Sequence, residues 1–124
     1  MALKTGDEYL ASIEALDLRA NVLGEAAQST ATHPLVQPSL RAVAMTYDCA
    51  HEPSSRDLFR AHSSLTGDEV NRFTHLHRSA DDLVKKVLMQ RHCGNLTGCC
   101  FQRCVGMDAA NAVYSVTYEC DAAH

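Results

Sequence analysis

The chain has 124 residues, of which 46% are hydrophobic and 6% aromatic, and its formal net charge at pH 7 is -4. This length suits one domain. Because no basic run occurs, nucleic acid and anionic membrane surfaces are not expected partners, and no apolar stretch reaches the roughly 18 residues that span a bilayer. The acidic start lacks the apolar run of a signal peptide. We therefore expect a cytoplasmic protein whose six cysteines are thiols or metal ligands rather than disulfides.

The N-terminal part predicts two helices separated by a loop. Thr5 and Glu8 have the spacing of a capping box, and apolar residues follow at helical intervals, so a helix is expected over roughly 6–19. The segment 21–38 carries a glycine and two prolines and predicts a loop. Pro38 is suited to the first turn of a second helix. The apolar stripe of that helix is formed by Leu40, Val43, Ala44, Tyr47 and Ala50.

The next part predicts a long surface loop and a third helix. Residues 53–78 are polar and poorly periodic, with a short extended piece expected at 72–77. Ser79 is placed as the N-cap of the helix, with acidic residues in its first turn, and Gly94 as its stop. The expected buried side of this helix consists of Leu83, Val84, Val87 and Leu88.

The last segment, about 97–119, predicts a fourth helix. Gly106 lies inside it, so a kink or two separate helices are alternatives. The predicted fold is therefore mainly α, with about four helices, one long loop and few or no strands.

Two cysteines near the last helix suggest half of a metal site. Cys100 and Cys104 are four positions apart, so on a helix both thiols would lie on one face. Thiolates bind iron–sulfur clusters, zinc and Cu(I). The alternative is that both are small buried hydrophobic residues, and the spacing alone favours it. Cys93 and Cys99 multiply the possible pairings.

The seven histidines do not form a zinc pattern. His75 and His77 would share a face of a strand, and His92 adjoins Cys93, but no C-x2-C spacing accompanies them. We interpret them as residues of loops and helix ends. The sequence also lacks a G-x-S-x-G elbow and a glycine-rich phosphate loop.

Several strings resemble one flavoprotein family. Short ones resemble the N-terminal region of the 4-hydroxyphenylacetate 3-hydroxylase group: TGDEYL, THP, AMTYD and SADDL. Two longer ones more specifically resemble the 4-hydroxybutyryl-CoA dehydratase/vinylacetyl-CoA isomerases: NRFTHLHRSADDLVKKVLMQR and TGCCFQRCVGMDAANAVYSVTYE. The similarity runs in order over nearly the whole chain.

This resemblance implies an acyl-CoA dehydrogenase-like N-terminal helical domain, with residues 1–124 as a single domain of a larger three-domain flavoprotein. Enzymes of this kind dehydrate 4-hydroxybutyryl-CoA to crotonyl-CoA by radical chemistry and isomerise vinylacetyl-CoA, using FAD and a [4Fe-4S] cluster. The acyl-CoA is their substrate, and full-length members are expected to be homo-oligomers. The FAD-binding segments are expected beyond His124, so these residues alone are expected to be inactive.

The resemblance also implies roles within the motif CFQRC. Cys100 and Cys104 would be two metal ligands of the cluster, while a third cysteine and a histidine come from a later domain. Gln102 is the candidate catalytic residue, placed to approach flavin or substrate; otherwise it is an exposed helix amide. Arg103 would balance the charge of the cluster; otherwise it forms a surface ion pair. Cys99 stands where the motif is not expected to have a cysteine, so it could compete for iron.

Two other functions remain open. The parent could be a 4-hydroxyphenylacetate 3-hydroxylase-type oxygenase that uses reduced flavin, but such enzymes need no cluster, so the C-x3-C spacing counts against it. The chain could also be a small non-catalytic helical module for interaction or metal binding. A stable, metal-free monomer would favour that reading.

Overall fold

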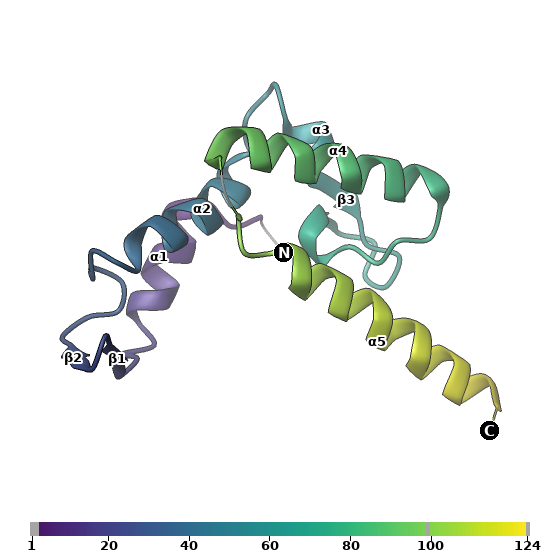
Figure 1. The fold of residues 1–124 in the computed structure, drawn as a ribbon. Coiled ribbons are helices and arrows are strands. Elements are labelled where there is room, and N and C mark those ends of the chain that lie inside the picture. The colour runs from purple at the N-terminus through teal and green to yellow at the C-terminus, as the bar shows by residue number, and fades with distance from the viewer. Residues whose placement is uncertain (1–2, 99, 124) are drawn as a thin grey trace.

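The computed structural model describes residues 3–98 and 100–123, and within them the chain is mainly helical, as predicted (Figure 1). The α-helices are α1 (Gly6–Glu14), α2 (Gln37–Asp48), α3 (Arg56–Phe59), α4 (Ala80–Thr97) and α5 (Cys104–Ala123), and η1 (Arg72–Thr74) is a 3-10 helix. The strands are β1 (Ala20–Val22), β2 (Glu25–Ala27), β3 (Arg60–His62) and β4 (Glu69–Asn71). They form two antiparallel hairpins, β1 with β2 and β3 with β4.

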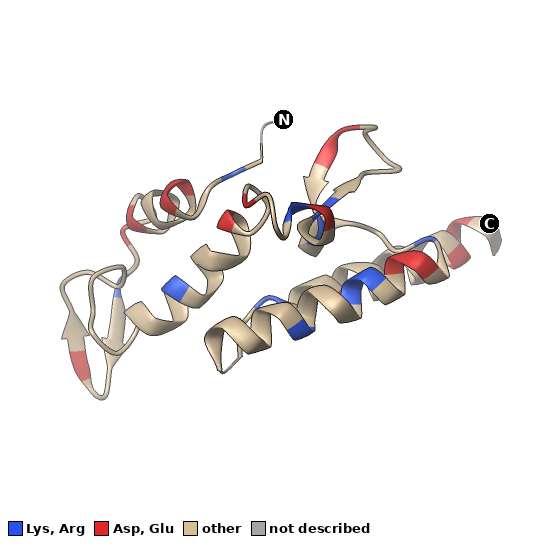
Figure 2. Cartoon of the chain, turned by 90° about the horizontal axis from the view of Figure 1, so that it is seen from above, with Lys and Arg blue, Asp and Glu red and all other residues tan. Residues whose placement is uncertain are grey.

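The elements form two groups joined at α2. Helices α1 and α2 pack together and carry the β1–β2 hairpin at their far end, while α4 lies over α3 and the β3–β4 hairpin (Figure 1). Helix α5 starts beside η1 and then extends away from the other elements. Acidic and basic residues are distributed over both groups (Figure 2).

The hydrophobic core lies where α2, α3, η1, α4 and the start of α5 meet. Its buried members are Cys49, Ala50, Phe59, Phe73, Met89, Cys93, Phe101 and Met107. Phe101 belongs to the segment between α4 and α5, so the core directly supports the CFQRC motif.

The start of α1 follows the prediction and its end does not. The capping box is formed: Thr5 N–H donates to Glu8 Oε2 over 2.8 Å, and Glu8 N–H to Thr5 Oγ1 over 3.2 Å. The helix ends at Glu14 rather than near 19, because the chain turns at Asp17, where φ is 45°. Gly6 lies against α2, where its N–H donates to Asp48 Oδ1 over 2.7 Å and a Cβ would collide with that carboxylate.

The predicted loop over 21–38 is wrong in its first part, which forms the β1–β2 hairpin. Its two turn residues are Leu23 and Gly24, with φ of 53° and 89°. Positive φ at both central residues is the geometry of the tight type I′ turn. Leucine is unusual there, so the turn carried no recognisable sequence signal.

The predicted loop over 53–78 is also too simple, because it contains α3, β3, β4 and η1. The extended piece was expected at 72–77, but the strand β4 ends at Asn71. Residues Arg72–Thr74 form the 3-10 helix, which the Asn71 side chain caps by accepting a bond from the Phe73 N–H.

Helix α4 begins as predicted and ends one turn later. The Ser79 side chain accepts a hydrogen bond from Asp82 N–H over 3.1 Å. Gly94 is not the stop, since the helix continues to Thr97 and Gly98 is its C-cap with φ of 62°. An αL glycine ends a helix because it carries no Cβ to clash.

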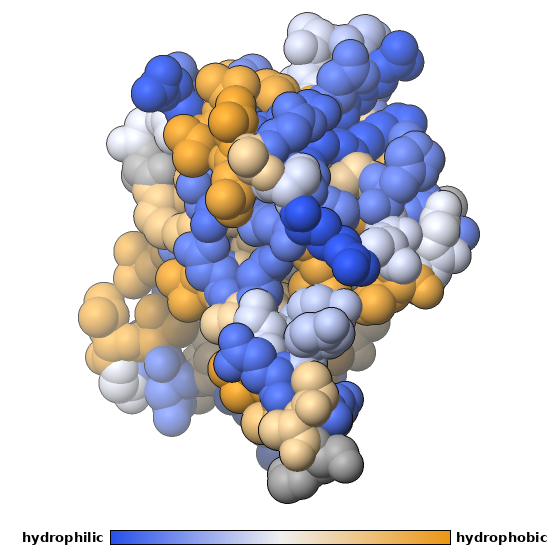
Figure 3. Space-filling model, turned by 90° about the vertical axis from the view of Figure 1, so that its right-hand side faces the viewer, coloured by the Kyte–Doolittle hydropathy of each residue, from blue (hydrophilic) through white to orange (hydrophobic). Residues whose placement is uncertain are grey.

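The predicted buried side of α4 is wrong. Its four residues are between 44% and 57% exposed (Leu83, Val84, Val87 and Leu88), whereas Met89 and Cys93 are fully buried. The helix has apolar residues on two faces, and the core takes up only the face that carries Met89 and Cys93. The view from the C-terminal side of α5 shows hydrophobic side chains exposed on the surface (Figure 3).

Helix α5 starts at Cys104, not near 97, and runs as one element through Gly106. Residues 100–103 are therefore not helical. The alternative of two separate helices at Gly106 is wrong for this chain.

Candidate metal-ligating site

The two cysteines of the motif lie on different kinds of backbone. Cys104 is the first residue of α5, whereas Cys100 lies in the non-helical segment before it. The predicted arrangement on one helical turn is therefore wrong. Cys100 is exposed and Cys104 half-buried, so Cys100 is not a buried hydrophobic residue. Cys99 lies outside the described residues.

The backbone between the cysteines makes a sharp turn. Gln102 has φ of 67°, in the left-handed region, and its N–H donates to Cys100 Sγ over 3.4 Å. A backbone N–H directed at a cysteine sulfur stabilises negative charge there, and such bonds are one way in which proteins adjust iron–sulfur clusters. The turn therefore directs a hydrogen-bond donor at the Cys100 sulfur, a contact of the kind that cluster ligands make.

Gln102 itself is exposed, as expected, but it is not on a helix. Its Nε2 donates to Ser39 Oγ of α2 over 3.2 Å. The contact joins segments 63 positions apart and places the amide at the same edge of the molecule as Cys100.

Arg103 turns inward and forms no surface ion pair, which corrects that alternative. Its Cζ lies 4.2 Å from the centroid of the Tyr47 ring and 4.6 Å from that of Phe73, and Nη1 donates to Thr46 Oγ1 over 2.9 Å. Burial lowers the pKa of Arg103, and the nearby Tyr47 and Tyr9 oppose this effect. No carboxylate of the described chain lies within 4.0 Å of the guanidinium.

Cys93 does not compete as a ligand in this structure. It is fully buried, and burial, with a contribution from Cys49, raises its pKa to about 12. A thiol with such a pKa stays protonated at neutral pH, whereas metal binding needs the thiolate. Burial likewise raises the pKa of Cys49, so both behave as core residues.

The described donors fit one half of an iron–sulfur site. Cys100 and Cys104 supply two sulfur atoms, the ligand type that such clusters use. In residues 3–98 and 100–123, no group of three or more histidine, cysteine, aspartate or glutamate side chains could hold a metal ion. The remaining ligands would have to come from elsewhere.

The histidines lie apart from this motif. His75 and His77 follow η1, with ring centroids 6.1 Å apart, and His75 Nε2 lies 3.1 Å from Asp82 Oδ1. Burial, followed by the charge of Lys86, lowers the pKa of His77. His92 packs edge-on against Phe59, with centroids 5.8 Å apart. His75 and His92 join α4 to the core, and the His77 N–H donates to Asn111 of α5 over 2.7 Å. They lie in a loop and a helix, as expected, but His75 is buried rather than partly exposed.

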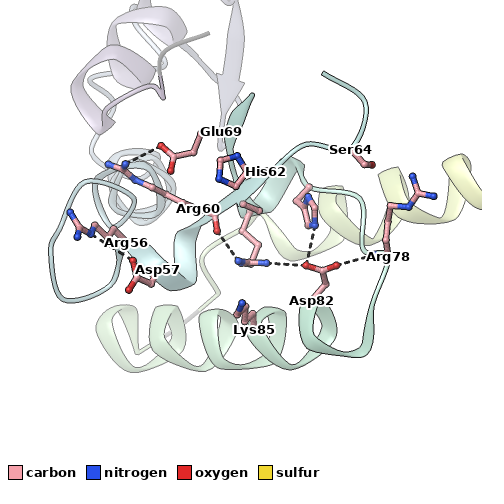
Figure 4. A pocket seen from close by; sticks show the side chains of 12 residues that line it. Arg56, Asp57, Arg60, His62, Ser64, Glu69, Arg78, Asp82 and Lys85 are labelled. Carbon is pink, nitrogen blue, oxygen red and sulfur yellow. Dashed lines mark hydrogen bonds and ion pairs between the residues drawn. The ribbon is translucent and has the colours of Figure 1, made fainter. Parts of the chain in front are cut away.

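A cavity of about 680 Å³ was not anticipated from the sequence (Figure 4). Cationic side chains from α3, β3, η1 and α4 line it, but most are already paired. Arg60 Nη1 lies 3.0 Å from Glu69 Oε2, and the buried Arg72 lies 3.4 Å from Asp82 Oδ1. Because these cations are paired with carboxylates, we interpret the cavity as the place where salt bridges join α4, η1 and the β3–β4 hairpin.

Residues 5–124 match the family model described as 4-hydroxyphenylacetate 3-hydroxylase N terminal. The chain belongs to this family. In the described part of this family member, no helix is long and apolar enough to cross a membrane.

Two curated relatives are enzymes. The chain is 50% identical over 119 residues to the 4-hydroxybutyryl-CoA dehydratase/vinylacetyl-CoA-Delta-isomerase of Clostridium aminobutyricum, covering 96% of this chain and 24% of that protein. It is 38% identical over 82 residues to the oxygenase component of 4-nitrophenol 2-monooxygenase from a Rhodococcus species, covering 64% and 15%. The chain thus spans about a quarter, or less, of the length of these relatives.

Solved structures show the same relationship. The oxygen-tolerant archaeal 4-hydroxybutyryl-CoA dehydratase from N. maritimus superposes with a TM-score of 0.91 and 46% identity, covering 99% of this chain and 24% of that one. The oxygenase component of 4-hydroxyphenylacetate 3-monooxygenase, solved in complex with FAD, superposes with a TM-score of 0.63 and 20% identity over 75% of this chain and 19% of that one. The second match shows the fold alone. The chain therefore corresponds to about a quarter of the 4-hydroxybutyryl-CoA dehydratases that it is similar to, and it matches the family model for the N-terminal part.

Proposed function

We propose that this chain is the N-terminal domain of a FAD- and [4Fe-4S]-dependent 4-hydroxybutyryl-CoA dehydratase/vinylacetyl-CoA isomerase. In this proposal residues 1–124 form one domain of a three-domain, cytoplasmic homo-oligomer that acts on acyl-CoA esters. The observation that carries the proposal is the turn of residues 100–104: Cys100 is exposed, Cys104 is half-buried, and the Gln102 N–H is directed at the Cys100 sulfur. The 50% identity to a dehydratase supports it.

Cys100 and Cys104 would hold two corners of the cluster. When bound, FAD supplies one-electron chemistry, and the cluster supplies a Lewis acid for the leaving hydroxyl. The chain's own part would be to anchor the two cysteines on a packed core, because Phe101, which lies between them in the sequence, is buried there. Gln102 would present its amide to the flavin or substrate from the same edge, held by Ser39.

An oxygenase of the 4-hydroxyphenylacetate 3-hydroxylase type is the second candidate. The family model and the monooxygenase relative favour it. The lower identity to that relative and the C-x3-C spacing of Cys100 and Cys104 count against it. A non-catalytic module is the least supported function, since the curated relatives with significant similarity are enzymes.

A chimera tests the proposal without any assumption about sequence beyond this chain. The matched N-terminal quarter of the Clostridium aminobutyricum enzyme is replaced by these residues, and the protein is purified without oxygen. We expect about four iron atoms and four sulfides per chain, and dehydration of 4-hydroxybutyryl-CoA. Cys100→Ala and Cys104→Ala should each lose most of the iron, whereas Cys120→Ala, at an exposed site far along α5, should keep it. A folded chimera whose iron content is insensitive to both motif substitutions would refute the assignment.

A further inference from the structure

The cavity between α3, the β3–β4 hairpin, η1 and α4 concentrates positive charge in an acidic chain. Its volume is about 680 Å³, and the formal net charge of the chain is -4. Five of the eleven lysines and arginines line this one cavity, against three of the fifteen acidic residues. Five cations and three carboxylates give the lining a formal charge of +2 when its histidines are neutral. The cations are Arg56, Arg60, Arg72, Arg78 and Lys85.

Two of these five cations, Arg60 and Arg72, form the frame of the cavity. Nε and Nη2 of the buried Arg72 donate to backbone carbonyls of α3 and β3 over 2.6 and 2.7 Å, and its Nη1 lies 3.4 Å from Asp82 Oδ1. Arg60 Nε donates to a backbone carbonyl that follows α2 over 2.6 Å, and its Nη1 donates to Glu69 Oε2 over 3.0 Å. These bonds fix the walls of the cavity and occupy two of its three carboxylates.

The guanidinium of Arg78 is not part of this frame. The backbone N–H of Arg78 donates to Asp82 Oδ2 over 3.1 Å, which fixes the residue at the edge of the cavity. Its side chain is exposed, and among the residues that the structure describes it has no hydrogen-bond or ion-pair partner. Figure 4 shows Arg78 and Arg56 on opposite sides of the cavity, with Arg60 and Asp82 between them. A positioned cation is therefore available to a ligand.

The other two cations, Arg56 and Lys85, have only exposed partners. Arg56 Nε lies 3.6 Å from Oδ1 of the adjacent Asp57, and these side chains are 56% and 96% exposed. Lys85 Nζ lies 2.7 Å from Oδ2 of Asp81, one turn earlier on α4. Exposed pairs of this kind contribute little free energy. A ligand anion can therefore replace either carboxylate at small cost.

Phosphate is the ligand chemistry that fits these side chains. An arginine binds two phosphate oxygens with parallel hydrogen bonds, and a lysine binds them as a point charge. The Ser64 hydroxyl and the His62 ring border the same space and offer further donors. A volume of about 680 Å³ lies within the usual range of ligand sites. Because charged side chains dominate the lining, an aliphatic ligand is not suited to this cavity.

We propose that this cavity binds a diphosphate-bearing ligand, with Arg56, Arg78 and Lys85 as the contacts of the phosphate oxygens. The paired Arg60 and Arg72 hold the walls in place for it. This inference rests on the proposed function, which includes two ligands of this chemistry. Both the acyl-CoA and FAD carry a diphosphate, and the experiment distinguishes between them.

The test uses the chimera described above and removes the cations of the cavity. Arg56→Met and Arg78→Met are made singly and together, and Arg19→Met removes an exposed cation outside the cavity as the matched control. Calorimetry measures the Kd of coenzyme A, and flavin absorbance measures the Kd of FAD. Both values are obtained without turnover. Thermal unfolding checks each variant, and the fold should be kept because these side chains are exposed.

We expect each single substitution in the cavity to raise the Kd of one of the two ligands by roughly tenfold, since each removes a hydrogen-bonded charge. The double substitution should raise it further, and Arg19→Met should match the parent chimera for both ligands. A higher Kd for coenzyme A with FAD binding unchanged identifies the acyl-CoA as the ligand. A higher Kd for FAD with coenzyme A binding unchanged identifies FAD.

Cavity variants that bind both ligands as tightly as Arg19→Met would overturn the inference. So would equal losses for both ligands, because one cavity holds only one of them, and so would a parent chimera that binds neither. If Arg78→Met does not fold, unchanged Kd values in Arg56→Met overturn the inference in the same way. A parent chimera that binds both ligands but holds no iron and sulfide would instead refute the proposed function, so the two failures are distinguishable.

Discussion

At the scale of single residues, Asp82 shows how acidic residues at a helix start serve the fold. Its carboxylate accepts bonds from Arg78 N–H and Ser79 Oγ, and its Oδ1 lies 3.1 Å from His75 Nε2 and 3.4 Å from Arg72 Nη1. Burial alone would raise the pKa of Asp82, but these hydrogen bonds and the charge of His75 lower it to about 2. The carboxylate therefore joins η1 to α4.

The lowered pKa predicts a specific loss of stability in acid. The folded pKa of Asp82, about 2, lies below the ordinary 3.8. The ionised carboxylate therefore contributes fully to the free energy of unfolding above pH 3.8, and this contribution is lost as the pH falls through 2. The difference corresponds to about 2 kcal/mol. Urea unfolding between pH 2 and pH 7 should show Asp82→Asn less stable by about this amount at pH 7, with the gap closing in acid.

Asp81→Asn is the matched control, because the Asp81 carboxylate is mostly exposed and pairs with Lys85 on the same helix. Exposed pairs of this kind contribute on the order of 0.5 kcal/mol. A stability gap for Asp82→Asn that does not change with pH would contradict the role of the carboxylate charge.

The left-handed turn at Gln102 gives a second prediction at this scale. With φ of 67°, a β-branched side chain is strained there and glycine is not. We expect Gln102→Val to be less stable than Gln102→Gly by about 1–2 kcal/mol. Ser39→Ala, which removes only the contact to the Gln102 amide, should cost less than about 1 kcal/mol. Equal stabilities of the valine and glycine variants in urea unfolding would argue against this turn.

At the scale of elements, α4 has two glycines near its end, and they have opposite roles. Gly94 is inside the helix, whereas Gly98 is the C-cap with φ of 62°. We predicted Gly94 as the stop, since the sequence alone does not tell which of two nearby glycines ends a helix. The structure distinguishes them by the positive φ of Gly98 and by the last helical hydrogen bond, from the Gly98 N–H to the Gly94 carbonyl over 2.9 Å.

These roles predict opposite signs for the same substitution. Gly94→Ala should stabilise the chain by about 0.5–1 kcal/mol, because alanine is favoured inside a helix and, apart from the adjoining residues and the helix's own backbone, no described atom lies within 4 Å of the added Cβ. Gly98→Ala should destabilise it by about 1 kcal/mol, because alanine is strained at positive φ. Thermal unfolding of the pair checks this, and reversed signs would place the end of α4 at Gly94.

At the scale of the whole molecule, a large apolar surface remains uncovered. On α4 it consists of Leu83, Val84, Val87 and Leu88, and on α5 of Val105, Val113, Val116 and Tyr118. Exposed apolar patches of this extent usually mark contact surfaces. The chain spans about a quarter of its dehydratase relatives, so we expect these faces to be contact surfaces, and we expect the 124-residue chain by itself to self-associate.

Charge placed on the exposed face of α4 should reduce this self-association. Leu83→Lys and Val87→Lys change side chains that are more than half exposed, so the free energy of unfolding should change by less than about 0.5 kcal/mol. Sedimentation velocity should show a shift toward monomer. Met89→Ala, on the buried face, should instead cost about 2–4 kcal/mol. A parent chain that is already a compact, stable monomer would contradict the expectation.

The sequence by itself determined the features that depend on neighbours within about four positions. The capping box at Thr5, the N-cap at Ser79 and the helix that follows Pro38 all have the predicted form, because each is stabilised by bonds or backbone preferences within one turn. The family resemblance also located the CFQRC motif, which no local rule would have distinguished from ordinary buried cysteines.

Tertiary structure alone decided which of several locally acceptable arrangements is formed. Helix α4 has two apolar faces, and only packing around Phe59 and Phe73 decided that Met89 and Cys93 enter the core. Likewise, Cys100 lies outside the helix that the sequence predicted for it. Arg103 points inward because Tyr47 and Phe73, far away in the sequence, provide rings on which its guanidinium stacks. Local preferences of about 1 kcal/mol are too small to resist such contacts. The placement of the motif is therefore a property of the whole fold.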